Sequence, residues 1–248
     1  MEPLFTIITA TFNASTTVER TIASVDAQSC KDYEHLILDG ASRDNTLDII
    51  KKYPNPNRRI NSEPDAGLYD AMNKGIGMSC GKYLIFLNAG DTFHSLDTLS
   101  MLASTIEREN FPGIVYGQTL IVDSEGKAVG ERHLLAPEKL TLKSFAQGML
   151  VCHQSFVPLR RVSGFYNLKY RFSADYEWCI RTLQHSRRNV YIPDDYIADY
   201  MNEGLTTQNK LPSLFERFRI MCYYYGTLPT CWRHIGFALR AIRRRFKK

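Results

Sequence analysis

The sequence predicts an α/β fold whose central sheet is doubly wound, mostly parallel and flanked by helices. Short runs of β-branched, aliphatic and aromatic residues alternate with segments whose apolar residues recur at helical spacing. Several runs end in aspartate, asparagine or glycine, as strands of an open α/β sheet often do at its ligand-binding edge. Because consecutive strands joined by helices run parallel, these polar ends should lie together.

The first half of the chain supplies the strands of this sheet. Residues 5–11 are rich in β-branched and aromatic residues and are followed by Asn13, so they are expected to form the first strand. Further strands are expected over residues 35–38, 59–62 and 83–87. The last of these runs is too short for a buried helix, which favours a buried strand.

Helices are expected between these strands. Thr16 and Glu19 have the spacing of a capping box, in which each side chain bonds a free backbone group of the first turn. Apolar residues at helical spacing then give one buried face: Val18, Ile22 and Val25. Ser42 is expected to cap a second helix that ends near Tyr53, and residues 65–75 open a third.

The second half changes character. Apolar residues at helical spacing predict one more helix with an inner face of Leu96, Leu99, Leu102 and Ile106. The patterns that follow predict a hairpin of residues 114–122 and 128–133, a helical or loop excursion over residues 140–150, strands over residues 151–157, 190–192 and 196–200, and a helix that Ser173 caps. Trp178 and Ile180 are available for burial on that helix.

The last part of the chain, residues 206–248, combines aromatic residues with a cluster of arginines and lysines after Arg240. Amphipathic helices of this composition can lie on an anionic membrane surface, where each basic residue adds about 1 kcal/mol of attraction. A packed terminal helix with a solvated basic end explains the same pattern. Both interpretations stay open at this point.

Composition limits the classes of function. The net charge of +5 is concentrated in that C-terminal cluster, so general nucleic-acid binding is poorly supported. No run approaches the roughly 18 apolar residues of a membrane span, and a cytoplasmic location is expected. The six cysteines form no Cys-x-x-Cys pair and are expected to be reduced and mostly in the core. The first strand is not followed by Gly-x-Gly-x-x-Gly, which argues against a dinucleotide-dependent oxidoreductase.

Candidate ligand-binding residues follow the strands. Asn88, Gly90 and Asp91 come directly after residues 83–87, and Asp39 ends the second strand. Oxygen-bearing side chains at a shared sheet edge suit a divalent cation and a nucleotide diphosphate. The same residues are also common turn formers. Lys74 could face phosphate, or it could belong to a solvated helix face of mixed charge.

Four segments, in order, resemble the family 2 glycosyltransferases of the GT-A fold, inverting enzymes that use nucleotide sugars. They are residues 6–13, residues 38–46, residues 65–75 with 81–83, and residues 87–91. The resemblance covers roughly residues 4–200. It implies a GT-A domain over residues 1–205, with a nucleotide-sugar half (1–110) and an acceptor half (111–205), and a helical basic tail over residues 206–248.

The resemblance assigns the donor nucleotide sugar to nine residues: Thr9, Thr11, Asn13, Asp39, Asp65, Asn73, Lys74, Asn88 and Asp91. Asn88 to Asp91 fall on the family's Asp-x-Asp-Asp segment, where only Asp91 keeps a carboxylate. Asp91 would therefore be one ligand of Mn²⁺ or Mg²⁺, and oxygens of the nucleotide would supply most of the others. Leu38-Asp39-Gly40 likewise has one carboxylate fewer than the Asp-Asp-Gly of many relatives.

The resemblance also implies which residues act as the general base and which lie near the acceptor. Asp175 matches the position of the base that inversion requires, with Glu177 as the fallback, and His153 and Gln154 match a feature near the acceptor. A first-turn helix aspartate and a structural histidine are the alternatives. Arg171 and Arg181 carry the charge that a diphosphate needs, but exposed helix arginines are usually only solvated, so neither is assigned.

The expected function is transfer of a sugar, most simply from a UDP-sugar, to a hydroxyl of a glycan or lipid-linked acceptor, as in relatives that build bacterial surface polysaccharides. The enzyme would work in the cytoplasm, with the tail at the inner face of the membrane. Because Asn88 and Gly90 replace acidic residues, a non-catalytic nucleotide-sugar-binding or scaffold protein is the alternative.

Overall fold

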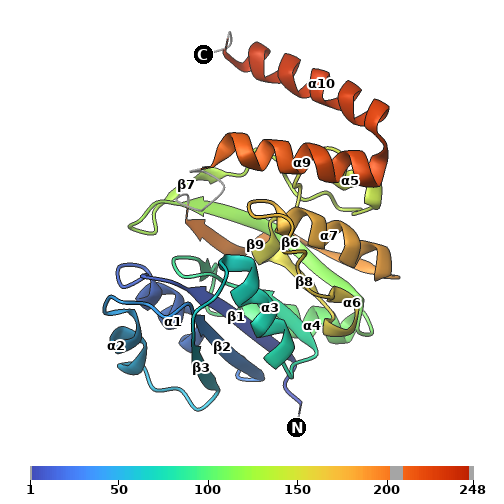
Figure 1. The fold of residues 1–248 in the computed structure, drawn as a ribbon. Helices are drawn as coiled ribbons and strands as arrows, with labels where there is room; N and C mark the ends of the chain where they lie inside the picture. Colours follow the sequence, from blue (N-terminus) through green and yellow to red (C-terminus); the bar gives the residue numbers. More distant parts are fainter. Residues whose placement is uncertain (1, 202–208, 246–248) are drawn as a thin grey trace.

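The structure is a computed structural model that describes residues 2–201 and 209–245 (Figure 1). Its first sheet contains four parallel strands in the order β3-β2-β1-β4: β1 (Phe5–Thr11), β2 (Tyr33–Asp39), β3 (Arg58–Ser62) and β4 (Tyr83–Phe86). Every residue of β1, β2 and β4 is buried, which explains their nearly continuous apolar sequences. The predicted parallel sheet is confirmed. Its register aligns Thr11 with Asp39, and Asp39 with Ser62, at one edge.

The first two helices have the predicted faces but not the predicted caps. In α1 (Val18–Asp26) the three expected apolar residues are buried, yet the N-cap is Thr17 and makes no side-chain cap bond, so the capping box is wrong. The second helix, α2 (Thr46–Lys51), begins after Asn45. Ser42 does not cap it, because its hydroxyl donates to the buried carboxylate of Asp39 instead.

The next two helices cover the sheet further along the chain. In α3 (Leu68–Met78), Met72 and Ile76 are buried in the main core cluster, beneath Ile8 and Leu38 of the strands. In α4 (Thr98–Arg108), three of the four predicted inner residues are fully buried. Leu96 is 64% exposed, because it precedes the helix. Its backbone carbonyl accepts a hydrogen bond from Ser29 N.

A second, mixed sheet follows, in the order β5-β9-β6-β7: β5 (Thr92–Phe93), β9 (Asn189–Met201), β6 (Ile114–Val122) and β7 (Ala128–Glu131), with β8 (Phe156–Pro158) also paired to β6. The β6–β7 hairpin is confirmed. Residues 190–192 and 196–200 belong to one strand rather than two, and the register between β6 and β9 shifts near Pro193, which has no N–H to donate. Residues 151–157 are only partly a strand, since a 3₁₀ turn, η1 (His153–Ser155), precedes β8.

Short helices α5 (Leu142–Phe145) and α6 (Arg160–Ser163) precede α7 (Ala174–His185), whose Trp178 and Ile180 are fully buried as predicted. Ser173 is its N-cap by position, but the hydroxyl contacts Ser213 instead of the helix backbone. The chain ends in α9 (Lys210–Tyr225) and α10 (Thr227–Arg245). Figure 1 shows α9 lying over the second sheet and α7, with α10 beyond it, farthest from the N-terminal sheet.

The described residues also test two expectations from composition. All six cysteines are free, but only Cys152 and Cys179 are buried, so placing most of them in the core was wrong. Cys80 lies in the exposed turn before β4, and Cys231 on the exposed side of α10. No helix within residues 2–201 and 209–245 is long and apolar enough to cross a bilayer.

Candidate active site

The carboxyl ends of β1 and β2 open into a cavity of about 750 Å³. Its walls come from the strand ends, from the segment that leads into the first turn of α3, and from residues 168–171, which precede α7. Thr11 lies at the end of β1, while Asp65, Tyr69 and Arg171 belong to the other walls. This is the sheet edge at which the sequence predicted a ligand.

Asp39 lies at the base of this edge and is almost fully buried. Its carboxylate accepts from the hydroxyls of Thr11 (3.1 Å), Ser42 (2.5 Å) and Ser62 (2.6 Å) and from Ser42 N (3.0 Å). Burial alone would raise the pKa of Asp39, but these donors outweigh it and hold the pKa below its ordinary value. The carboxylate is therefore ionised, and a nucleobase contact would have to replace one of the hydroxyls.

Two other residues that were predicted to bind the nucleotide sugar do not line the cavity. They stabilise the edge of the sheet instead. Thr9 is fully buried; its hydroxyl donates to Leu87 O (2.7 Å) and contacts His35 Nε2 (2.9 Å). Asn13 is exposed, with its backbone N donating to Ser42 Oγ (2.8 Å) and its amide oxygen accepting from Arg43 N (2.9 Å). Both residues fix the loops around Asp39.

Residues 65–75 likewise contain one predicted residue that lines the cavity and two that bond other parts of the protein. Asp65 lines the cavity and lies close to Gly40, where a Cβ would stand 2.6 Å from Asp65 Oδ2. Asn73 instead forms two hydrogen bonds with the Tyr166 backbone. Lys74 Nζ donates to Pro64 O (2.9 Å) and lies 3.0 Å from Glu63 Oε1, so its assignment to phosphate stays a prediction that needs these bonds to be exchanged.

Asn88 and Asp91 lie together after β4, as expected of a strand end. Asp91 is buried, accepts from Gln154 Nε2 (2.8 Å) and Met201 N (3.1 Å), and its burial raises its pKa to about 6 against the effect of these donors. Gly90 between them has φ 104°, and a Cβ would meet Met201 Cε at 2.6 Å, so glycine is required there. Asn88 Oδ1 is buried, and no described residue donates to it.

These oxygens are a partial fit for a divalent cation. No group of three or more histidine, cysteine, aspartate or glutamate side chains among the described residues could hold a metal. The unpartnered Asn88 oxygen and the Asp91 carboxylate are nevertheless the ligand types that Mg²⁺ and Mn²⁺ take. The remaining ligands would come from nucleotide oxygens and water, so binding of the cation should depend on the nucleotide.

Asp175 lies in the first turn of α7 and is buried. Its carboxylate accepts from Tyr69 OH (3.1 Å) and from Tyr176 N (2.8 Å), and its Oδ2 is 3.6 Å from His153 Nδ1. Burial would raise the pKa of Asp175, but His153, the charge of Arg217 and the Tyr176 N–H together hold it below its ordinary value. The group is an ionised carboxylate next to a cavity residue, as a general base must be.

His153 and Gln154, both buried on η1, connect the two carboxylates. Asn88 Nδ2 lies 3.4 Å from His153 Nε2, on the ring edge opposite Asp175. His153 therefore faces Asn88 with Nε2 and Asp175 with Nδ1. Gln154 donates to Asp91. The structure thus brings five predicted residues into one series of contacts from the strand end to α7.

Glu177, the predicted fallback for the base, lies outside this series of contacts. Its carboxylate pairs with Arg181 (3.1 Å) and accepts from Tyr224 OH (2.7 Å) of α9. The sequence interpretation also missed Tyr69, although it singled out the segment that contains it. Only a contact across 106 residues reveals that the Tyr69 hydroxyl bonds the predicted base.

Comparison with known proteins places the chain in a family. Residues 6–163, more than half of the chain, match the family described as "Glycosyl transferase family 2". The chain belongs to glycosyltransferase family 2. This glycosyltransferase is 34% identical over 208 residues to the PGL/p-HBAD biosynthesis glycosyltransferase of Mycobacterium bovis (strain BCG / Pasteur 1173P2), covering 82% of this chain and 78% of the relative. It is 30% identical over 146 residues to the putative teichuronic acid biosynthesis glycosyltransferase TuaG of Bacillus subtilis (strain 168), covering 56% of each.

Solved structures confirm the fold. The family 2 glycosyltransferase resembles S. aureus TarS 1-349 in complex with UDP-GlcNAc, with a TM-score of 0.71, 15% identity, and 89% of this chain and 66% of that one covered. It also resembles the mannosyltransferase PcManGT from Pyrobaculum calidifontis in complex with GDP-Man and Mn2+, with a TM-score of 0.63, 13% identity, and coverage of 96% and 76%. The predicted GT-A fold, with its mostly parallel central sheet, is correct. The enzyme is a glycosyltransferase of polysaccharide or glycoconjugate biosynthesis.

Proposed function

We propose that the protein is an inverting glycosyltransferase that moves a sugar from a UDP-sugar to a hydroxyl of a glycan or lipid-linked acceptor. The single observation that carries the proposal is the ionised, buried Asp175, bonded by the cavity residue Tyr69 and connected through His153 to Asn88 at the strand end. Relatives named for PGL/p-HBAD and teichuronic acid biosynthesis support a glycolipid or polysaccharide acceptor. The UDP-GlcNAc complex of TarS supports a UDP-linked donor.

In this proposal the reaction is a single displacement. The acceptor oxygen attacks the anomeric carbon, the bond from that carbon to the diphosphate oxygen breaks, and Asp175 takes the acceptor's proton. Tyr69 OH and Tyr176 N hold the carboxylate in place for that transfer. Asn88 and Asp91 would hold a divalent cation, which when bound supplies neutralisation of the leaving diphosphate's charge.

The first test is nucleotide binding and its dependence on metal. UDP with Mn²⁺ should raise the melting temperature by about 5 °C or more at 100 times the dissociation constant. Mn²⁺ alone should give little shift, because the protein offers one carboxylate and one amide oxygen. In Asp91→Ala the metal-dependent part of the UDP shift should disappear, as measured by thermal denaturation with Mn²⁺ or with EDTA.

Two outcomes would contradict this proposal. If UDP, GDP and dTDP all left the melting temperature of the wild type unchanged, the hypothesis that the protein binds a nucleotide sugar would be wrong. An equal Mn²⁺-dependent shift in the wild type and Asp91→Ala would place the metal elsewhere. Glu125→Ala, which removes an exposed carboxylate in the β6–β7 turn, is the matched control and should behave as the wild type.

We also propose that the C-terminal helices contact an anionic lipid surface. The described part of α10 exposes four apolar residues spaced for one face: Leu228, Trp232, Ile235 and Leu239. The sequence of α10 contains no acidic residue and ends in arginines, whose side chains from Arg240 onward lie outside the described residues. An outward apolar face on a helix of basic sequence suits anionic headgroups.

Vesicle sedimentation tests this surface. The protein should bind vesicles that contain phosphatidylglycerol and bind pure phosphatidylcholine weakly, and added salt should weaken the binding. Replacing Trp232 and Ile235 together by serine should reduce binding about tenfold or more, because two apolar side chains no longer leave water. Leu96→Ser removes an equally exposed apolar residue in front of α4 and serves as the control. Unchanged binding by the double variant would contradict the proposed surface.

A further inference from the structure

The donor cavity has an uneven charge. Asp65 and Asp70 contribute carboxylates to its walls, and Arg171 is the only basic side chain among the described residues that line it. A nucleoside diphosphate brings at least two negative charges into such a cavity, so it needs a cationic partner. Lys74, the predicted cation, is already engaged by Glu63 and Pro64 O and does not line the cavity.

Arg171 is available for that role. It is exposed, and its guanidinium carbon lies 5.7 Å from the centre of the Phe172 ring. Within the described residues no carboxylate pairs with it. An unpaired guanidinium at a cavity wall presents several donors that match phosphate oxygens.

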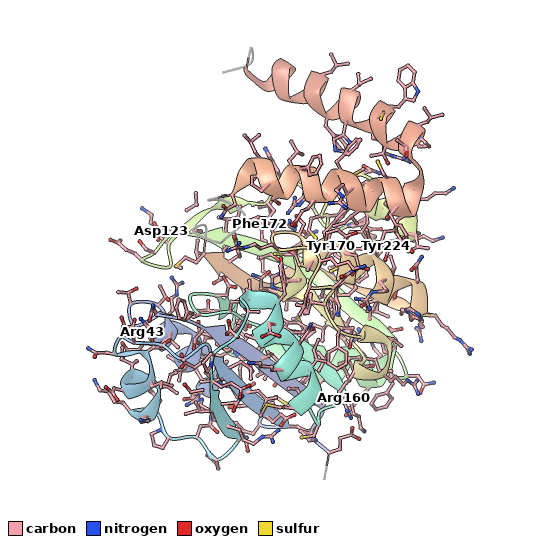
Figure 2. All side chains as sticks on the ribbon, viewed as in Figure 1. Arg43, Asp123, Arg160, Tyr170, Phe172 and Tyr224 are labelled. Carbon is pink, nitrogen blue, oxygen red and sulfur yellow. The ribbon has the colours of Figure 1, made fainter. Side chains whose placement is uncertain are left out.

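The position of Arg171 depends on α9. The Glu216 carboxylate of that helix accepts from Arg171 N at Oε1 (2.8 Å) and from Phe172 N at Oε2 (2.8 Å). One residue later, Ser173 Oγ contacts Ser213 Oγ of the same helix (2.9 Å). Figure 2 shows Tyr170 and Phe172 beneath α9, with Tyr224 on that helix. Two charge-assisted bonds to successive backbone groups fix the backbone at a residue that lines the cavity.

We propose that Arg171 binds the diphosphate of the donor, and that Glu216 is the positioning residue that holds Arg171 at the cavity. This inference rests on the proposed nucleotide-sugar function and adds a contact that the strand-end residues do not provide. Through Glu216, α9 would also contribute to binding of the nucleotide sugar, although this helix belongs to the C-terminal tail.

The test compares UDP with uridine, which lacks the phosphates, by calorimetry in the presence of Mn²⁺. Arg171→Gln should weaken UDP binding about tenfold, the loss expected for a hydrogen bond to a charged group, and leave uridine binding unchanged. Arg171→Lys should recover part of the affinity for UDP. Glu216→Gln should weaken UDP in the same direction, because an amide offers only one acceptor oxygen to the two N–H groups. The double variant should lose no more than Arg171→Gln, since Glu216 acts through Arg171.

Two controls match the charge changes. Arg187→Gln removes an exposed arginine just beyond the far end of α7, and Glu107→Gln removes an exposed carboxylate on α4. Both should bind UDP as the wild type does. Equal UDP binding by Arg171→Gln and wild type would overturn the inference alone, as would an equal loss of uridine and UDP binding in Glu216→Gln. A wild type that binds no UDP would overturn the proposed function and this inference together.

Discussion

Replacing Asp175 by asparagine should lower kcat for sugar transfer by about 10²- to 10⁴-fold, the usual contribution of a positioned general base. Asparagine keeps the size of the side chain, and its oxygen can still accept from Tyr69 OH and Tyr176 N. It cannot take up the acceptor's proton. UDP affinity should therefore stay within about twofold of wild type, which separates a lost chemical step from a damaged cavity. Steady-state kinetics with a UDP-sugar, together with UDP titration calorimetry, measure both quantities.

Glu177→Gln decides between the two first-turn carboxylates of α7. Glu177 is tied to Arg181 and to Tyr224 of α9, away from Tyr69 and His153. Its loss should change the melting temperature more than kcat. If Glu177→Gln abolished transfer while Asp175→Asn did not, the base would be Glu177. If both variants and the wild type gave the same low turnover, the non-catalytic interpretation would be preferred.

The parts of the fold that the sequence predicted correctly are those set by local patterns. Strands β1, β2 and β4 are buried on both faces, so their apolar runs were unmistakable, and parallel pairing then aligned Thr11, Asp39 and Ser62 at one edge. Periodicity likewise gave the inner face of α1 and, apart from Leu96, that of α4. It did not give the residues that cap helices, because a hydroxyl near a helix start bonds whichever acceptor the tertiary fold supplies. Ser42 bonds Asp39 for that reason.

The candidate site depended on contacts that no local pattern contains. The resemblance to family 2 named Asp175 and Asp91, yet Tyr69 and Glu216 reach the site through partners 106 and 45 residues away in the chain. Asn73 and Lys74 had residue types suited to a ligand, but the backbone of Tyr166 and the Glu63 carboxylate hold them. Residue type therefore predicted which chemistry is present, and only the packing of distant segments decided which side chains face the cavity.

A buried histidine should make the protein unstable in weak acid. His35 is fully buried between β1 and β3, where its Nε2 lies 2.9 Å from Thr9 Oγ1 and its Nδ1 accepts from Arg58 Nε (3.2 Å). Thr9 donates its own proton to Leu87 O, so its oxygen accepts from Nε2–H, and the neutral ring satisfies both neighbours. Burial, with the Arg58 charge as a second cause, lowers the pKa of His35 to about 3.

The sign of the pH effect follows from that shift. Below pH ~6.5 the unfolded chain binds a proton that the folded chain refuses until pH ~3, so this contribution to stability is complete above pH ~6.5 and falls as the pH drops. Between pH 7.5 and 4.5 the loss from this one group should be about 3 kcal/mol in the free energy of unfolding. Urea denaturation at several pH values measures it.

His35→Gln should be less stable than the wild type at pH 7.5, because a glutamine fits the Thr9 and Arg58 contacts less well, but it should lose about 3 kcal/mol less on acidification. His185→Gln, at an exposed ring near the end of α7, should keep the wild-type pH dependence. Equal pH dependence in His35→Gln and wild type would contradict the assignment.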